Sequence, residues 1–245
     1  MERLCRPAIV DRRRAFTLVE LLVVVGVIAL LIAMLLPVLS RARRAANNAA
    51  CLSNLRQVHQ SFHLYALDHR DAVPLGYRSA TKQFNSMIYS ITTAPPRWVL
   101  FGLLIESGHI ADPRVVYCPA ESNPMFMYDT PDNPWPPYDA APATNIQSGY
   151  GSRPEHRIAD DLSGRLPRLT EMKNLAIFAD LTAARVRVIT RHVDGINVLY
   201  GHGGAQWVPL DRFDQPQAQW AEPVFPLTDH ANSTHDAIWA ALDRH

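Results

Sequence analysis

Two histidines, His59 and His63, stand four positions apart in the stretch His-Gln-Ser-Phe-His. On a helix this spacing places both imidazoles on one face, as in the His-Glu-x-x-His zinc motif of metalloproteases. Gln60 occupies the place of the glutamate that acts as general base in that motif, so this chemistry lacks its base. Because the spacing alone is frequent in helices, we interpret the pair as two polar positions on a solvated helix face.

No other stretch carries a complete catalytic or metal-binding motif. The chain has no Gly-rich phosphate loop, no Gly-x-Ser-x-Gly and no Cys-x-x-Cys, so we predict no enzyme, no cofactor and no metal site. The first 15 residues carry five arginines and two acidic residues, whereas the rest carries 19 basic and 21 acidic residues. With no basic excess over the body of the chain, binding to nucleic acid is not expected.

Residues 21–36 form a run of sixteen without a polar side chain, and the run extends back to Phe16 with two interruptions, Thr17 and Glu20. A helix of this extended length is about 31 Å long and can cross a hydrocarbon core. Arginines at 12–14 favour a cytoplasmic N-terminal side, although three more follow the apolar run. The core is longer than that of a secretory signal peptide, which is therefore the less favoured interpretation.

The acidic side chain of Glu20 is out of place in this apolar run. A charged side chain at the bilayer centre costs roughly 2.5–3.5 kcal/mol on insertion scales, and less near a helix end. A free α-amine on a neighbouring subunit would be a suitable partner. That amine exists only if the chain is cut directly before Phe16.

Residues 12–24, Arg-Arg-Arg-Ala-Phe-Thr-Leu-Val-Glu-Leu-Leu-Val-Val, resemble the class III signal of type IV pilins and type II secretion pseudopilins. Counted from Phe16, Glu20 is at mature position five and Pro37 at position twenty-two, as in that family. Ala15 replaces the usual glycine before the cut. The resemblance implies that a prepilin peptidase cleaves between Ala15 and Phe16 and methylates Phe16. It also implies that Glu20 neutralises the amine of an adjacent subunit during assembly.

The resemblance predicts an α+β, pilin-like fold, in which a long N-terminal helix packs on a small antiparallel β-sheet head. We expect a cytoplasmic leader at 1–15, a transmembrane or filament-core helix at 16–39 and a head at 40–245. The chain would be a subunit of a pilus or pseudopilus filament in the inner membrane, with its head outside the cytoplasm. Its partners would be the peptidase, other pilin subunits and the inner membrane. The alternative is a membrane-anchored extracytoplasmic binding or metal-binding protein.

Helical character continues beyond Pro37, which removes one backbone hydrogen bond and should kink the helix. Apolar residues then recur every three or four positions as far as Tyr65, which predicts one amphipathic helix. We expect it to end between Asp68 and Ala72, ahead of Pro74.

Three cysteines occur, of which Cys5 lies in the expected leader. Cys51 and Cys118 would lie outside the cytoplasm, where a disulfide is permitted. The bond would close a loop of about 67 residues and contribute about 4 kcal/mol by the chain-entropy estimate. Two buried free thiols fit the sequence equally well.

The C-terminal half carries a second resemblance, to processing-associated domains of pseudopilin-like proteins. These have a His, nine residues and then Asp-Gly, whereas here His192 is followed after nine residues by His202 and Gly203. The stretches 51–57 and 116–119 resemble the same proteins. His202 replaces the acidic residue, so we favour a structural turn over a metal pair formed by His192 and His202.

Short patterns predict the remaining elements of the head. The prolines and aromatic residues of 120–147 indicate a long loop packed by its own aromatic side chains, rather than a partner-binding surface. The other expected elements are a helical turn at 98–110, an extended segment at 115–119, strands at 175–179 and 185–190, a hairpin of 197–200 with 205–208, and a helix at 235–242.

Overall fold

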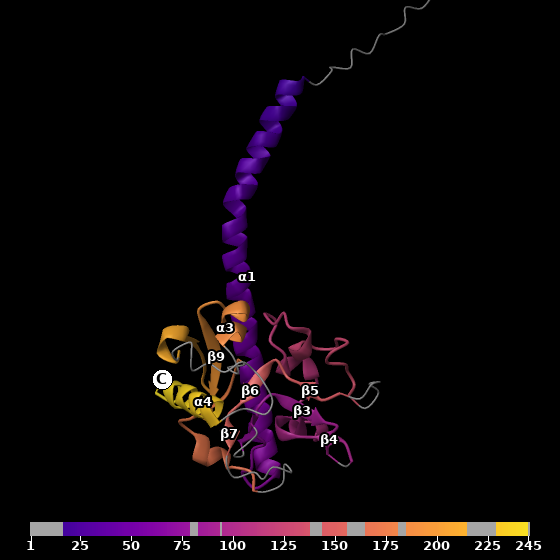
Figure 1. Ribbon diagram of the computed structural model, residues 1–245, viewed down its shortest axis with the longest axis vertical. Coiled ribbons are helices and arrows are strands. Elements are labelled where there is room, and N and C mark those ends of the chain that lie inside the picture. Colours follow the sequence, from indigo (N-terminus) through magenta and orange to yellow (C-terminus); the bar gives the residue numbers. More distant parts are fainter. Residues whose placement is uncertain are drawn as a thin grey trace, which may run out of the picture. The chain divides into compact units, whose positions relative to one another are not determined.

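The computed structural model describes residues 17–78, 83–93, 95–137, 144–155, 165–180, 185–214 and 229–244 (Figure 1). The chain divides into two compact units, one ending at Arg43 and one beginning at Arg44. Each unit is described by itself.

The helix α1 covers Leu18–Asp68 and contains Pro37. Its end falls inside the predicted range of 68–72, and the kink at Pro37 stays a prediction. Among the described helices, α1 alone is long and apolar enough to cross a membrane, judged by length and composition. The large apolar side chains of its first half are exposed, for example Leu18 at 79% and Leu39 at 66%. A surface this apolar needs lipid or other subunits to cover it.

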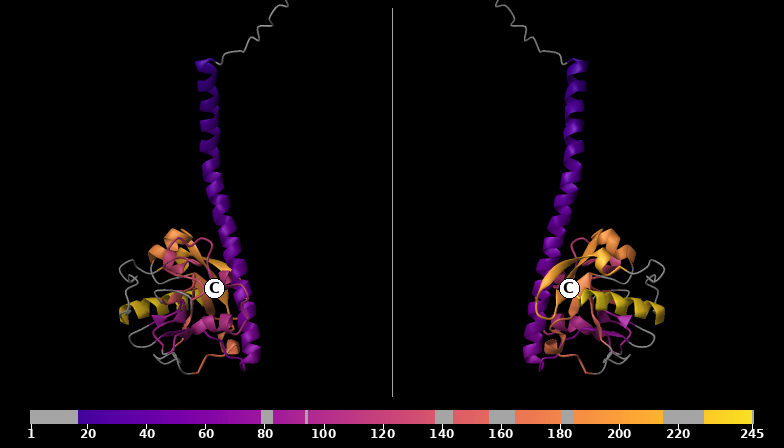
Figure 2. Two further views of the ribbon diagram at one scale, coloured as in Figure 1. Left: turned by 90° about the vertical axis from the view of Figure 1, so that its right-hand side faces the viewer. Right: turned by 90° about the vertical axis from the view of Figure 1, so that its left-hand side faces the viewer.

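The second half of α1 supplies one wall of the head's core, and Figure 2 shows it beside the sheet. Leu55, Val58 and Phe62 are fully buried, at helical spacings of three and four. The ring of Phe62 meets that of Phe178 edge-on, with 5.9 Å between the ring centroids. The amphipathic pattern of this segment therefore packs as predicted.

The main sheet has four antiparallel strands in the order β10-β9-β8-β6. The predicted hairpin is confirmed, since Trp207 pairs with Asn197 and Val208 with Ile196. The predicted strand at 175–179 is confirmed as β8. The four strands are β6 (Tyr150–Ser152), β8 (Ala176–Asp180), β9 (Gly195–Tyr200) and β10 (Ala205–Pro209).

Two smaller sheets complete the mixed α+β head. One has the order β4-β3-β5 and is antiparallel, and the other has the order β2-β1-β7, in which β1 and β7 run parallel. Their strands are β1 (Gly76–Arg78), β2 (Gln83–Phe84), β3 (Met87–Ser90), β4 (Arg97–Trp98), β5 (Ile146–Gln147) and β7 (Pro154–Glu155).

Strands β6, β8 and β9 of the main sheet are buried on both faces. Leu199 of β9 belongs to the core cluster that includes Phe62 of α1, whereas Val198 belongs to a second cluster with Trp239 of α4 (Asp229–Leu242). Neighbouring residues of a strand point to opposite faces, so β9 serves both clusters. The predicted C-terminal helix at 235–242 is thus confirmed and begins earlier than expected.

Two expected elements of the head are wrong. Residues 185–190 form part of helix α3 (Arg185–Arg191) instead of a strand, because Val188 and Arg191 are buried at a spacing of three while Val186 is exposed. The alternation of arginine and valine is too short to separate the two periods. Residues 115–119 begin in the 3-10 turn η2 (Pro113–Val116), and Tyr117 follows in extended geometry without forming a strand.

The remaining elements are short. The predicted helical turn at 98–110 is present as η1 (Leu100–Gly102) and α2 (Leu103–Glu106). Further 3-10 turns are η3 (Pro124–Phe126), η4 (Leu169–Met172) and η5 (Leu210–Arg212).

Aromatic side chains fix the long loop, as predicted for its described residues, which exclude 138–143. The ring of Tyr128 lies 5.4 Å from that of Tyr117 and 5.7 Å from that of Trp135. Trp135 in turn lies 5.6 Å from Trp98 of β4. The loop is therefore joined to a sheet through its own aromatic residues.

We expect the substitution Trp135→Ala to lower the free energy of unfolding by about 1–3 kcal/mol, because it removes a half-buried indole and two ring contacts. Urea unfolding of the full chain in detergent, followed by near-ultraviolet circular dichroism, measures the change. The control is Met125→Ala in the same loop, where the side chain is 49% exposed and the change should stay within about 0.5 kcal/mol. Equal effects of the two substitutions would contradict the packing role.

Candidate functional site

The first candidate site is the N-terminal segment. Ala15, Phe16 and Cys5 lie outside the described residues. Thr17 is the first described residue, and Glu20 lies in the first turn of α1. The Thr17 backbone N–H and Oγ1 donate to Glu20 Oε2 at 2.9 and 2.7 Å, and the Glu20 N–H donates to Thr17 Oγ1 at 3.2 Å. This reciprocal arrangement is a helix capping box. The sequence signal for this capping box is Thr-x-x-Glu at the start of a helix. The interpretation of Glu20 as a partner for an α-amine overlooks that signal.

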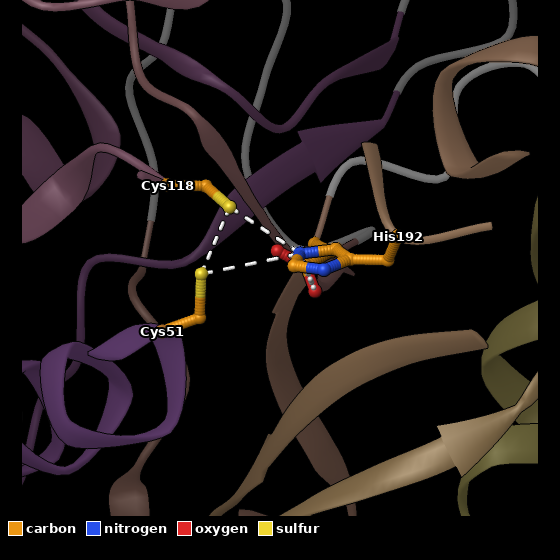
Figure 3. Close-up of side chains that lie close together, drawn as sticks. Cys51, Cys118 and His192 are labelled. Carbon is orange, nitrogen blue, oxygen red and sulfur yellow. Dashed lines mark hydrogen bonds and ion pairs between the residues drawn. The ribbon is translucent and has the colours of Figure 1, made fainter. Parts of the chain in front are cut away.

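The second candidate site is a buried group of four side chains, Cys51, Cys118, Asp180 and His192, which we call the cysteine–histidine cluster. Figure 3 labels the two cysteines and the histidine. Cys51 lies on the second half of α1, and Cys118 follows η2. Asp180 ends β8, and His192 directly follows α3. Four different segments thus supply one side chain each, and the two cysteines lie far from each other and from Asp180 and His192 in the sequence.

The polar atoms of the cluster converge. The two sulfurs are 2.9 Å apart, and His192 Nε2 lies 3.3 Å from Cys118 Sγ and 3.9 Å from Cys51 Sγ. The same nitrogen is 3.1 Å from Asp180 Oδ2. One ligand atom from each residue lies within 4.8 Å of the others. Both cysteines are free thiols in the structure, so the disulfide between them stays a prediction.

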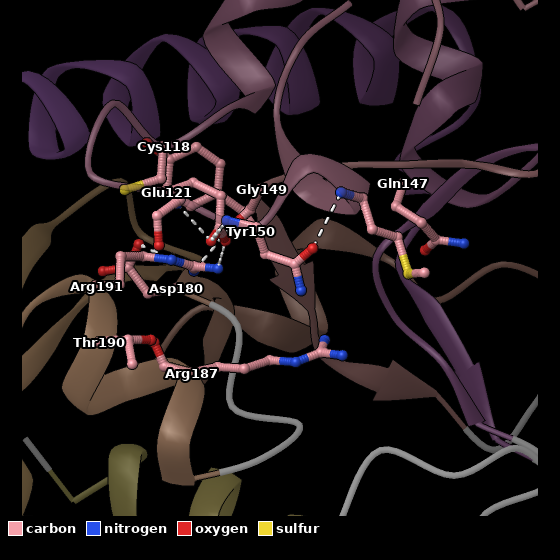
Figure 4. Close-up of polar contacts among 12 residues, drawn as sticks. Cys118, Glu121, Gln147, Gly149, Tyr150, Asp180, Arg187, Thr190 and Arg191 are labelled. Atoms are coloured by element: carbon pink, nitrogen blue, oxygen red, sulfur yellow. Dashed lines mark hydrogen bonds and ion pairs between the residues drawn. The ribbon is translucent and has the colours of Figure 1, made fainter. Parts of the chain in front are cut away.

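A polar network holds the carboxylate of the cluster in place. The backbone N–H and the Nδ2 of Asn197 donate to Asp180 Oδ2 at 2.7 and 3.0 Å. The other oxygen, Oδ1, is buried and has no hydrogen-bond partner among the described residues, and Arg191 Nη1 is 4.0 Å away. Arg191 also donates to Glu121 and to the carbonyl oxygen of Gly149 (Figure 4). The network therefore places one further carboxylate, that of Glu121, and one guanidinium beside the cluster.

Burial and charge set the protonation of these groups. Burial raises the pKa of the Cys118 thiol well above its usual value, and the neighbouring Cys51 and Asp180 raise it further. Burial lowers the pKa of His192, but the charge and the hydrogen bond of Asp180 outweigh it and raise the pKa to about 10. Without a bound ion, the Cys118 thiol thus stays protonated, and His192 faces Asp180 as an imidazolium.

The structure does not bring the two predicted motif histidines together at one ligand site. His192 belongs to the buried cluster, whereas His202 lies in the turn between β9 and β10, where its Nδ1 is 3.0 Å from the Lys173 carbonyl oxygen. Gly203 has a φ of +92° in this turn, which favours glycine. A Cβ on Gly203 would also lie 2.8 Å from Cε1 of His59. The turn interpretation of the His202-Gly203 pair fits this geometry.

His59 and His63 differ from the expected solvated pair. His63 is exposed, but His59 is half-buried against the hairpin turn, with its Nε2 3.2 Å from the Gly201 carbonyl oxygen. Burial lowers the pKa of His59. The spacing along the helix did not reveal this contact because the turn is more than a hundred residues away in the sequence.

Comparison with known proteins identifies the first site. Residues 11–36 match the family model of the prokaryotic N-terminal methylation motif. No curated protein and no solved structure gives a significant match to the chain. Together with the long apolar helix, the motif fits a prepilin-type pilin or pseudopilin. The family is one of structural subunits, and the match supports a type IV pilin- or pseudopilin-like precursor.

Proposed function

We propose that this chain is a structural subunit of a type IV pilus-like or type II secretion pseudopilus filament. A prepilin peptidase cleaves it between Ala15 and Phe16 and methylates the new amine of Phe16. The leader is 1–15, the membrane and filament-core helix is 16–39, and the head is 40–245. Before assembly the chain crosses the inner membrane once with its head outside the cytoplasm, and the filament stands in the periplasm or at the cell surface.

The observation that carries the proposal is the methylation motif at 11–36, which includes the start of α1 and much of its uncovered apolar surface. A membrane anchor alone needs the apolar surface but not the motif. A filament core needs both, since the same surface passes from lipid to neighbouring helices after cleavage exposes the N-terminus. The structural role also agrees with the absence from the sequence of a complete catalytic motif.

We expect the substitution Ala15→Leu to block processing, because a bulky side chain then replaces the small residue before the cut. The matched variant Ala15→Gly should be processed at least as fast as the unaltered chain. Coexpression of each variant with a prepilin peptidase and a gel assay for loss of the 15-residue leader measure cleavage. Efficient cleavage of the leucine variant, or none of the glycine variant, would contradict cleavage at this bond.

A further inference from the structure

We propose that Cys51, Cys118, Asp180 and His192 form a closed zinc site that fastens the head together. This role goes beyond filament assembly and does not depend on it. The ligand class is a divalent transition metal ion of borderline softness, and the donor set of two sulfurs, one nitrogen and one oxygen suits Zn²⁺.

The first argument is convergence on a single nitrogen. His192 Nε2 lies within 3.9 Å of both sulfurs and 3.1 Å from Asp180 Oδ2. A ring nitrogen carries one proton, so it can donate to only one of these three neighbours. A metal ion at the centre would instead accept an electron pair from each of the four groups. The arrangement therefore suits one shared cation better than a set of pairwise hydrogen bonds.

The second argument is size. With bonds of about 2.3 Å to sulfur and about 2.0 Å to nitrogen and oxygen, a tetrahedral zinc site has ligand–ligand edges of about 3.3–3.8 Å. The distances from His192 Nε2, between 3.1 and 3.9 Å, are close to these edges. The two sulfurs, at 2.9 Å, are closer than an edge. Binding therefore requires the two sulfurs to move apart by about 0.9 Å.

The third argument is the carboxylate of Asp180, which is only 1% exposed. Buried polar atoms are nearly always hydrogen-bonded, yet Oδ1 has no such partner among the described residues. Asn197 meanwhile holds Oδ2 through two hydrogen bonds. Orientation of a ligating carboxylate by hydrogen bonds is the usual arrangement around a protein-bound metal.

Burial decides what kind of site this is. Cys51 is fully buried, and Cys118, Asp180 and His192 are at most 5% exposed. Four protein ligands in a closed pocket leave no position for water or substrate, as in structural zinc sites. The ion would cross-link α1, the segment after η2, the end of β8 and the end of α3.

A disulfide between the two cysteines is the competing outcome, and the two states exclude each other. Zinc needs both sulfurs as thiolates and the Nε2 of His192 without its proton, so its binding releases these three protons without any change of oxidation state. A disulfide removes both ligands and leaves His192 and Asp180 as a buried ion pair. Metal content and thiol content therefore separate the two states.

The test uses the full chain, isolated from membranes in detergent under non-reducing conditions. We expect about one zinc ion per chain by elemental mass spectrometry. Cys51 and Cys118 should react with a thiol reagent in denaturant only after a chelator is added. A metal-free chain lighter by two hydrogens would overturn the proposal in favour of the disulfide. A metal-free chain with reactive thiols would overturn it as well.

Cobalt substitution locates the ion. Co²⁺ added to the chelator-treated chain should give a near-ultraviolet thiolate-to-metal charge-transfer band, and zinc should displace it. The substitutions Cys118→Ser and His192→Gln should each weaken zinc binding at least about tenfold. His202→Ala is the matched histidine control and should keep the full metal content. If the chain without substitutions shows no charge-transfer band with Co²⁺, the proposal is overturned, even if the variants fail to fold. Normal leader cleavage in a metal-free chain would leave the proposed filament role standing.

Discussion

Replacing Glu20 with alanine is expected to abolish filament assembly while cleavage between Ala15 and Phe16 continues. In the filament, the Glu20 carboxylate would neutralise the N-terminal amine of an adjacent Phe16 inside an apolar bundle. Removal of one partner from a buried ion pair costs about 3–5 kcal/mol, because the other charge stays unpaired. Assembly per subunit should therefore fall about a hundredfold or more. Electron microscopy and sedimentation of sheared filaments measure it.

The capping box at the start of α1 supplies the control. Glu20→Gln removes the charge but keeps a side chain that can accept from the Thr17 N–H, as glutamine does in other capping boxes. If the charge sets the register between subunits, Glu20→Gln should fail to assemble, as Glu20→Ala does. Normal filaments with Glu20→Gln and none with Glu20→Ala would show that the helix cap is what matters. Normal filaments with both variants would refute any role of Glu20 in assembly.

The substitution Arg191→Ala is expected to lower the free energy of unfolding of the head by about 3–5 kcal/mol. The guanidinium is 1% exposed, contacts Glu121 and donates to the Gly149 carbonyl oxygen at 3.0 Å. Its Nη1 also lies 4.0 Å from Asp180 Oδ1. Its loss leaves two buried carboxylates without this counter-charge. Urea unfolding of the full chain in detergent measures the effect.

Arg212→Ala is the matched control for Arg191→Ala, since Arg212 is exposed in the 3-10 turn η5 and its removal should change stability by no more than about 0.5 kcal/mol. The double variant Arg191→Met with Glu121→Gln should recover part of the loss, because it removes both charges of the pair. If Arg191→Ala unfolds at the same urea concentration as Arg212→Ala, the buried ion pair does not stabilise the head.

Local sequence patterns predicted the long helix and the hairpin because both depend on neighbours in the chain. The repeat of apolar residues up to Tyr65 marks the buried face of α1, and Gly201-His-Gly-Gly204 marks the turn between β9 and β10. The short stretch at 185–190 was predicted wrongly because its alternation fits a strand, whereas its packing partner, the main sheet, selects a helix. Packing against elements distant in the sequence determines the secondary structure of this segment, and a local sequence pattern does not contain that information.

The cysteine–histidine cluster lay mostly beyond sequence reasoning. The sequence motif links His192 to His202, ten residues away, whereas the neighbours of His192 in space are Cys51, Cys118 and Asp180. The sequence does predict a disulfide between the two cysteines as one alternative to two free thiols, because only these two cysteines remain once the leader is removed. One further signal was present, since an aspartate directly after the apolar run of β8 predicts a buried acid that needs a partner. The convergence itself depends on the tertiary fold.

The most direct test of the filament-subunit account is mass spectrometry of the N-terminal peptide of the chain isolated from the membranes of its host. The account predicts a mature chain that begins at Phe16 and carries one methyl group on its α-amine. A chain that still begins at Met1, with its arginines in place, would contradict it.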